Sequence, residues 1–113
     1  MAFYVVWDAE ITNRAGLEPY VAAVSDTIAK HGGRYLARAG TTKLMEGQPE
    51  PKVVVILEFP DAASFDRWYK SPEYQKILPH RLQNSTGRLF TVEGVTATEA
   101  ELLREAHERR NNS

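Results

Sequence analysis

The chain has 113 residues, of which 42% are hydrophobic and 26% are charged, as is typical of one globular domain with a single core. The absence of cysteine excludes disulfides and cysteine-ligated metals, and the net charge of −1 argues against binding to a nucleic-acid backbone. The sequence has neither a long apolar run nor a signal-peptide pattern, so we expect a cytoplasmic protein that binds neither nucleic acid nor membrane.

The first predicted element is a strand at residues 3–7, where five residues of high β-propensity follow one another. A helix follows, because apolar side chains recur with helical spacing over residues 17–28. Asn13 is the candidate N-cap of this helix. A second strand is expected at residues 34–39, with a β-bulge at Gly40.

The strongest predicted strand is residues 53–59, in which Glu58 alone interrupts the apolar character. After it, Asp61 is the expected N-cap of a second helix, and Ser71 is the expected N-cap of a third. Pro79 is expected to break or kink the third helix, because proline removes a backbone hydrogen bond.

The last strand is expected at residues 88–93, followed by a charged helix that begins with a capping box of Thr98 and Glu101. We therefore divide the chain into a folded domain, residues 1–95, and a charged C-terminal helical arm, residues 96–113. The order β-α-β-β-α-β predicts an α+β fold of the ferredoxin-like type. In this fold, helices cover one face of a four-stranded antiparallel sheet.

The two central strands of such a sheet are the first and third, and in this chain both are apolar on both faces. An exposed sheet face normally alternates with polar residues. We therefore expect a homodimer in which two open sheet faces pack together. The alternative is a monomer whose C-terminal arm covers the open face.

Several phrases of the sequence stand out: Gly32-Gly33-Arg34-Tyr35-Leu36-Ala37-Arg38, Glu46-Gly47, Glu58-Phe59-Pro60, Trp68-Tyr69-Lys70-Ser71-Pro72-Glu73-Tyr74-Gln75, Arg81 and Val92-Glu93-Gly94. In this order they resemble the bacterial family called domain of unknown function 1330. The resemblance covers residues 3–95, and it implies a dimeric α/β barrel without an agreed activity. Proteins of that fold include cofactor-free monooxygenases, isomerases, haem-binding enzymes and ligand-sensing domains, so the fold alone does not identify the chemistry.

Arg81 is the first candidate for a ligand contact, because its helical spacing from Tyr74 directs it inward. A guanidinium there would bind a carboxylate or an enolate oxygen with two parallel hydrogen bonds. The alternative is a structural ion pair with Glu58 or Glu93. Arg38 is a second candidate anion contact, and the alternative is a solvated arginine on an edge strand.

Three aromatic side chains are further candidates. The hydroxyls of Tyr69 and Tyr74 would donate to a carbonyl or an oxyanion, and Trp68, with Trp7, would line an aromatic cavity. The alternative for all of them is packing in the core.

Glu58 and His80 are the candidates for proton transfer. A salt bridge at the dimer interface explains Glu58 equally well, and a surface position explains His80. The spacing of the histidines predicts no metal site, and no cofactor is expected.

Together these features predict a small homodimer that binds a small organic molecule, aromatic or carboxylated, between sheet and helices. Such a protein would act as a cofactor-free monooxygenase-like or isomerase-like enzyme. The alternative is a non-catalytic ligand-binding or sensing dimer.

Overall fold

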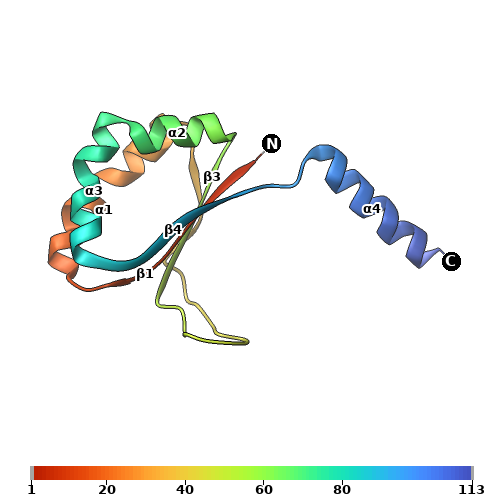
Figure 1. The fold of residues 1–113 in the computed structure, drawn as a ribbon, viewed down its shortest axis with the longest axis horizontal. Coiled ribbons are helices and arrows are strands. Elements are labelled where there is room, and N and C mark those ends of the chain that lie inside the picture. The colour runs from red at the N-terminus through yellow and green to blue at the C-terminus, as the bar shows by residue number, and fades with distance from the viewer. Residues whose placement is uncertain (1, 113) are drawn as a thin grey trace.

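The computed structural model describes residues 2–112 of the chain (Figure 1). The first half contains β1 (Phe3–Ile11), α1 (Arg14–Lys30), β2 (Arg34–Arg38) and β3 (Val53–Phe59). The second half contains α2 (Ala62–Lys70), α3 (Pro72–Asn84), β4 (Ser85–Glu93) and α4 (Ala97–Asn111).

The four strands form one antiparallel sheet in the order β2-β3-β1-β4, so β1 and β3 are central. Helices α1, α2 and α3 all lie on one face of this sheet (Figure 1). The predicted α+β, ferredoxin-like fold is therefore confirmed.

The core fills the space between this helical layer and the sheet. Because side chains alternate along a strand, Val5 of β1 and its partner Leu57 of β3 point to the same face, toward the helices. There they pack against Leu17 and Ile28 of α1 and against Trp68 of α2. All five side chains are buried.

The three predicted N-caps are confirmed. Asn13 accepts a hydrogen bond from the backbone of Gly16, Asp61 from Ser64, and Ser71 from Tyr74. These caps satisfy backbone donors at the helix starts and therefore define where α1, α2 and α3 begin.

The expected break at Pro79 is wrong, because α3 is continuous from Pro72 to Asn84. Proline removes one backbone hydrogen bond from the helix. The neighbouring side chains Ile77, Leu78 and Arg81 are buried, and this packing holds the last turns of α3 in place.

Two further expectations are wrong in detail. The irregularity in β2 lies between Tyr35 and Ala37 rather than at Gly40, because the pairing with β3 shifts at that point. The capping box of α4 is formed by Thr96 and Glu99, two residues earlier than expected. Both pairs have the same spacing, so the pattern alone did not distinguish them.

Strands β1 and β4 also differ from expectation in length. Strand β1 continues to Ile11 and β4 begins at Ser85, because these two residues pair with each other at the end of the ladder. Because the residues at that end of the ladder are turn-prone, β-propensity alone did not predict these additional pairs.

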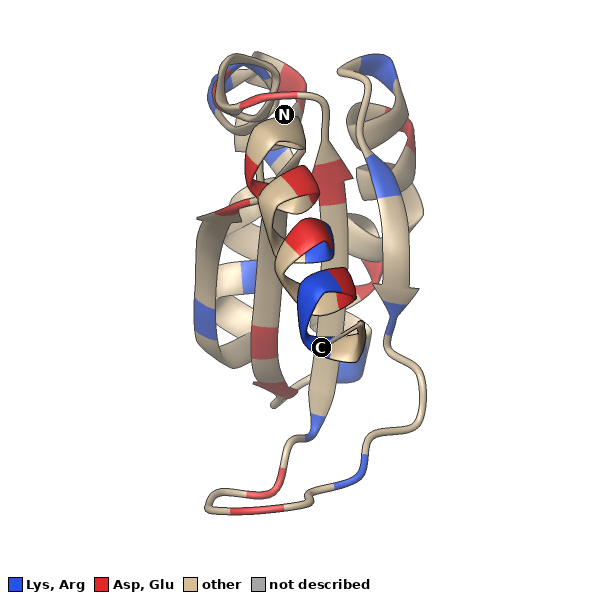
Figure 2. Ribbon diagram, turned by 90° about the vertical axis from the view of Figure 1, so that its right-hand side faces the viewer, with Lys and Arg blue, Asp and Glu red and all other residues tan. Residues whose placement is uncertain are grey.

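The second face of the sheet is uncovered. The side chains that point to it include Tyr4 and Val6 of β1, Val54 and Ile56 of β3, and Phe90 of β4. We call these five residues the open sheet face. Figure 2 marks the charged residues along the strands, and the register places Asp8, Glu58 and Arg88 on this face beside the five apolar or aromatic side chains.

Helix α4 projects away from the rest of the chain, on the side of the sheet opposite to α1, α2 and α3 (Figures 1 and 2). None of its described side chains is buried. The radius of gyration is 17.2 Å, against about 13 Å for a compact domain of this length, as expected for a projecting arm. No helix within residues 2–112 combines the length and the apolar character needed to span a membrane.

Candidate functional site

A cavity of about 300 Å³ lies between α1 and the helix-covered face of the sheet. Four aromatic side chains line it: Trp7, Tyr20, Tyr35 and Trp68. The remaining walls are mainly aliphatic side chains of β1, β3 and α1. The cavity is therefore an apolar, aromatic site of the size that suits a small molecule.

The local sequence explains these walls. On α1, Leu17, Tyr20 and Val24 are three and four residues apart, so they share one helix face. On the sheet, Trp7 of β1 lies opposite Val55 of β3, and both point toward α1. The cavity remains between these two apolar surfaces.

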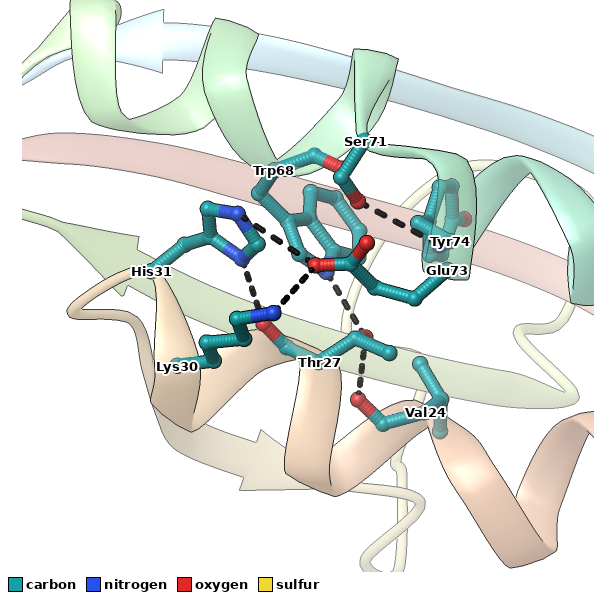
Figure 3. A network of polar contacts seen from close by, with 8 residues as sticks. All are labelled: Val24, Thr27, Lys30, His31, Trp68, Ser71, Glu73 and Tyr74. Carbon is teal, nitrogen blue, oxygen red and sulfur yellow. Dashed lines mark hydrogen bonds and ion pairs between the residues drawn. The ribbon is translucent and has the colours of Figure 1, made fainter.

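Trp68 is fixed by a network of buried polar contacts (Figure 3). Its indole nitrogen donates to the Thr27 hydroxyl at 3.0 Å, and that hydroxyl donates to the carbonyl of Val24 at 2.6 Å. The Ser71 hydroxyl donates to the Trp68 carbonyl at 2.7 Å. Both the side chain and the backbone of Trp68 are thus anchored.

The end of α1 is tied to the start of α3 by charged groups beside Trp68 (Figure 3). The Glu73 carboxylate lies 3.1 Å from Lys30 Nζ and 3.8 Å from His31 Nε2. His31 Nδ1 donates to the Thr27 carbonyl at 2.8 Å. A hydrogen bond from its own backbone, followed by that from Lys30, holds the pKa of Glu73 below its ordinary value. These contacts stabilise the helical layer around the cavity.

Arg81 is buried, with only 6% of its surface exposed, but it does not line the cavity. Its guanidinium carbon lies 5.6 Å from the ring centroid of Trp7 and 5.7 Å from that of Tyr20. Both rings line the cavity, so Arg81 lies behind two of its walls and interacts with their π-faces. Its Nε has no hydrogen-bond partner among residues 2–112.

The ion pair of Arg81 with Glu58 or Glu93, offered as the alternative, is wrong. Within residues 2–112 no carboxylate oxygen lies within 4.0 Å of Arg81. Glu58 instead binds Arg34 at 2.8 Å. Because Glu58 pairs with Tyr4 in the sheet register, it points to the opposite face.

The hydroxyls of Tyr20 and Tyr74 lie 3.0 Å apart beside Arg81. Burial, and then the neighbouring Tyr74, raises the pKa of Tyr20. Burial also raises the pKa of Tyr74, although the Arg81 cation opposes this shift. Both hydroxyls therefore stay neutral at physiological pH. Tyr74 is fully buried and does not line the cavity.

The structure separates the candidate residues into two groups. Trp68 and Arg38 line the cavity, whereas Arg81, Tyr69, Tyr74, Glu58 and His80 do not. Tyr69 stacks on Phe65 with ring centroids 5.7 Å apart, and His80 is exposed on α3.

Four charged or aromatic residues of the cavity did not appear among the candidates: Arg14, Glu18, Tyr20 and Tyr35. The signal for Tyr20 was its place in the apolar stripe of α1, and the signal for Tyr35 was the alternation of β2. No local pattern distinguishes Arg14 from other exposed arginines.

The chemistry of the walls favours binding of an apolar molecule. The indole N–H of Trp68 and the hydroxyls of Tyr20 and Tyr35 already have protein partners, so three of the four aromatic walls offer ring faces rather than free donors. Among residues 2–112, no three histidine, aspartate or glutamate side chains gather where they would hold a metal ion.

A protein-family model described as Domain of unknown function (DUF1330) matches residues 2–95. No curated protein matches the sequence significantly. The chain is similar in fold to a solved protein of unknown function from Rhodopseudomonas palustris, with a TM-score of 0.65 and 24% identity. That match covers 84% of this chain and 83% of the other.

Two other solved structures share this fold. One is a dimeric ferredoxin-like protein of unknown function from Jannaschia sp. CCS1, with a TM-score of 0.60 and 16% identity over 85% of this chain and 100% of the other. The second is SnoaB, a cofactor-independent oxygenase from Streptomyces nogalater, with a TM-score of 0.54 and 18% identity over 85% of this chain and 93% of the other.

Proposed function

Since the chain belongs to the family described as Domain of unknown function (DUF1330), which specifies no activity, we propose a function from the geometry of the cavity. Each protomer of a homodimer binds one small, mainly aromatic molecule between α1 and the sheet. The proposed primary role is binding, as in a ligand-binding or sensing module.

The aromatic cavity is the observation that carries this proposal. Its volume of about 300 Å³ is at the lower end of the range for small-molecule sites, and its walls combine flat rings with aliphatic side chains. A planar apolar molecule would gain dispersion and stacking contacts with Trp7, Tyr20 and Trp68. The site therefore suits a molecule of one or two rings.

The candidate residues have different roles in this proposal. Trp68 and Arg38 contact the ligand directly, because they line the cavity. Arg81 supports the rings of Trp7 and Tyr20 from behind. Tyr74 supports Tyr20 through the hydrogen bond between their hydroxyls.

The homodimer is proposed to form through the open sheet face. This face presents Val6, Val54 and Ile56, and the side chain of Phe90 is 41% exposed. Covering these side chains with a second copy removes apolar surface from water. The description of the Jannaschia protein as dimeric supports a dimer, although it does not specify an interface.

A second candidate function is a cofactor-free enzyme that oxygenates or isomerises the bound molecule. The observation that favours it is the position of Arg81, a cation directly behind two walls of the cavity. Such a cation would stabilise negative charge that develops on a bound molecule. The description of SnoaB as a cofactor-independent oxygenase agrees with this candidate.

Native mass spectrometry of the protein purified from its own source tests the proposed function. We expect a dimer that retains one small molecule per protomer. Val21→Trp, which places a large ring in the cavity wall, should abolish retention, whereas Leu82→Trp on the outer surface of α3 should not. Retention that is equal in both variants would contradict the site.

The molecule recovered with the protein distinguishes the binding module from the cofactor-free enzyme. Consumption of oxygen by the protein with the recovered molecule, followed with an oxygen electrode, would identify an oxygenase. Conversion of the molecule to an isomer would identify an isomerase. Recovery of the molecule unchanged, without oxygen consumption, would support the binding module.

A further inference from the structure

We propose that the ligand carries one acidic group, a carboxylate in the simplest case, which stays at the mouth of the cavity between Arg14 and Arg38. The aromatic part of the ligand enters the cavity. This inference rests on the proposed function, because it specifies the ligand class of the same site.

The charged side chains of the cavity define its mouth. Arg14 and Glu18 lie one turn apart on α1, and Arg38 is the last residue of β2. All three residues are exposed, unlike the apolar walls. Within residues 2–112, none of the three forms an ion pair, so the mouth carries one uncompensated positive charge.

Arg38 is held in a position that suits an anion. Its guanidinium carbon lies 5.0 Å from the ring centroid of Tyr35, and the Tyr35 hydroxyl hydrogen-bonds to Ser25 of α1 at 3.0 Å. The stacked contact with the ring leaves the edge of the guanidinium available. That edge presents paired N–H donors, which match the two oxygens of a carboxylate.

The interior of the cavity excludes the acidic group. The hydroxyl of Tyr20 is paired with Tyr74 and the indole N–H of Trp68 with Thr27, so neither is free to solvate an anion. A carboxylate that entered the cavity would lose its hydration and gain at most one donor, the indole N–H of Trp7, which is costly. The ligand therefore binds with its rings inside and its acidic group at the mouth.

Isothermal titration calorimetry with 2-naphthoate and 2-naphthamide tests this orientation. The two probes have the same rings and nearly the same shape, and only the first is charged. We expect the wild-type protein to bind 2-naphthoate about two- to fivefold more tightly than the amide, a difference within the range of exposed charge pairs.

Three variants test whether the charged residues at the mouth cause the preference for 2-naphthoate. Arg14→Gln and Arg38→Gln should each remove most of this preference, and Glu18→Gln should increase it, because a repelling carboxylate is lost. Arg109→Gln, on the exposed surface of α4, changes the net charge equally and should have no effect. The affinity for 2-naphthamide should stay constant in all four variants.

Two results would overturn the inference, and they are distinguishable. Equal affinity for both probes, unchanged in the variants, would reject the acidic group and leave the proposed cavity intact. No binding of either probe would reject both the acidic group and the proposed cavity.

A different observation carries a second inference: we infer that α4 packs against the second copy of the chain. Leu102 is 57% exposed and Leu103 is 64% exposed, and no described side chain of α4 is buried in the protomer. An isolated helix of 15 residues is only marginally stable in water, even with the capping box of Thr96 and Glu99. A packing surface for α4 must therefore come from outside the protomer.

The direction of α4 identifies this surface. The helix projects on the side of the open sheet face, opposite to α1, α2 and α3 (Figures 1 and 2). The proposed homodimer places the partner on that side, so this inference rests on the dimer. At 1.5 Å per residue, the 15 residues of α4 extend about 22 Å, enough to pass the partner's sheet and reach its helical layer.

Carbodiimide cross-linking of a mixture of ¹⁴N-labelled and ¹⁵N-labelled protein tests this inference. The reagent joins carboxylates to lysines, and α4 carries Glu99, Glu101, Glu105 and Glu108 but no lysine. We expect mass spectrometry to find cross-links from these glutamates to lysines of the other isotopic form. A stable dimer whose α4 cross-links join only chains of one form would overturn the inference while leaving the dimer intact.

The double variant L102E/L103E gives an independent readout. It should raise the dissociation constant of the dimer about tenfold or more, because two leucine side chains in the proposed contact are replaced by charged ones. Leu82→Glu, on the outer surface of α3, is the matched control and should leave the constant unchanged. A wild-type protein that is monomeric would overturn both the dimer and the docking of α4.

Discussion

The indole nitrogen of Trp68 donates a hydrogen bond to the hydroxyl of Thr27 across 3.0 Å, and both residues are buried. This bond joins α2 to α1 and fixes the ring that forms one wall of the cavity. Because Thr27 also donates to the Val24 carbonyl, its hydroxyl serves two partners at once.

Thr27→Val keeps the shape of the side chain but removes its hydroxyl. The buried indole N–H then has no acceptor, so we expect the free energy of unfolding to fall by about 1–3 kcal/mol. Urea denaturation measures this loss. Thr27→Ser keeps the hydroxyl and should lose less, and equal losses in both variants would show that packing, rather than the hydrogen bond, stabilises this contact.

Gly33 is the second position that tests the packing of the core. A Cβ on Gly33 would lie 2.7 Å from the Phe59 ring and 2.8 Å from Ile28, and both side chains are buried. Gly33→Ala should therefore lower the free energy of unfolding by about 1–3 kcal/mol. Gly40→Ala is the control, because a Cβ added to Gly40 would have no neighbouring atom within 4 Å, and it should change stability by less than about 0.5 kcal/mol.

The paired hydroxyls of Tyr20 and Tyr74 predict a loss of stability at high pH. Burial raises the pKa of both phenols in the folded state above the ordinary value of about 10. Above that pH the unfolded chain releases protons that the folded chain retains, so the free energy of unfolding falls as pH rises. The slope is up to about 1.4 kcal/mol per pH unit for each phenol.

Urea denaturation between neutral pH and strongly alkaline pH measures this slope. The double variant Y20F/Y74F lacks both hydroxyls, so its stability should decline less steeply than that of the wild type in the alkaline range. Parallel curves for the two proteins would contradict the assignment of the alkaline loss to these tyrosines.

Substitutions of Arg81 measure how much a buried cation without an anionic partner contributes to the free energy of unfolding. Arg81→Met removes the charge but retains an apolar side chain of similar length, so the lost cation–π contacts are offset by relief of desolvation. We expect a change of less than about 1 kcal/mol in the free energy of unfolding. Arg81→Ala also leaves a cavity and should cost about 2 kcal/mol or more.

Thermal and urea unfolding of the two Arg81 variants provide the comparison. If Arg81→Met is as destabilising as Arg81→Ala, the guanidinium itself is needed for folding. Its contacts with Trp7 and Tyr20 would then contribute more than the cost of its burial.

Much of the fold was predictable because its signals are local. The helix starts at Asn13, Asp61 and Ser71 follow from single side chains that cap their own helices, and the strand at residues 53–59 follows from β-propensity. Pro79 was misjudged because the packing of α3 against its neighbours, which no local pattern records, outweighs one missing hydrogen bond.

The candidate site was less predictable, because it depends on which elements meet. The helical spacing correctly placed Arg81 in the interior, but it gave no information on whether a carboxylate or two aromatic rings would face it. Glu58 was assigned to the site from its strand alone, whereas its register opposite Tyr4 places it on the other sheet face. The cavity itself exists only where α1 crosses the sheet, so no single segment encodes it.

The central claim is that a second copy covers the open sheet face, which leaves the cavity under α1 as the apolar site for a ligand. Sedimentation equilibrium tests it most directly. The wild-type protein should have twice the chain mass of 12.8 kDa, and Phe90→Glu, which places a charge on the open face, should shift the equilibrium toward one chain mass without loss of circular dichroism. A wild-type protein that stays at 12.8 kDa at every concentration would contradict the account.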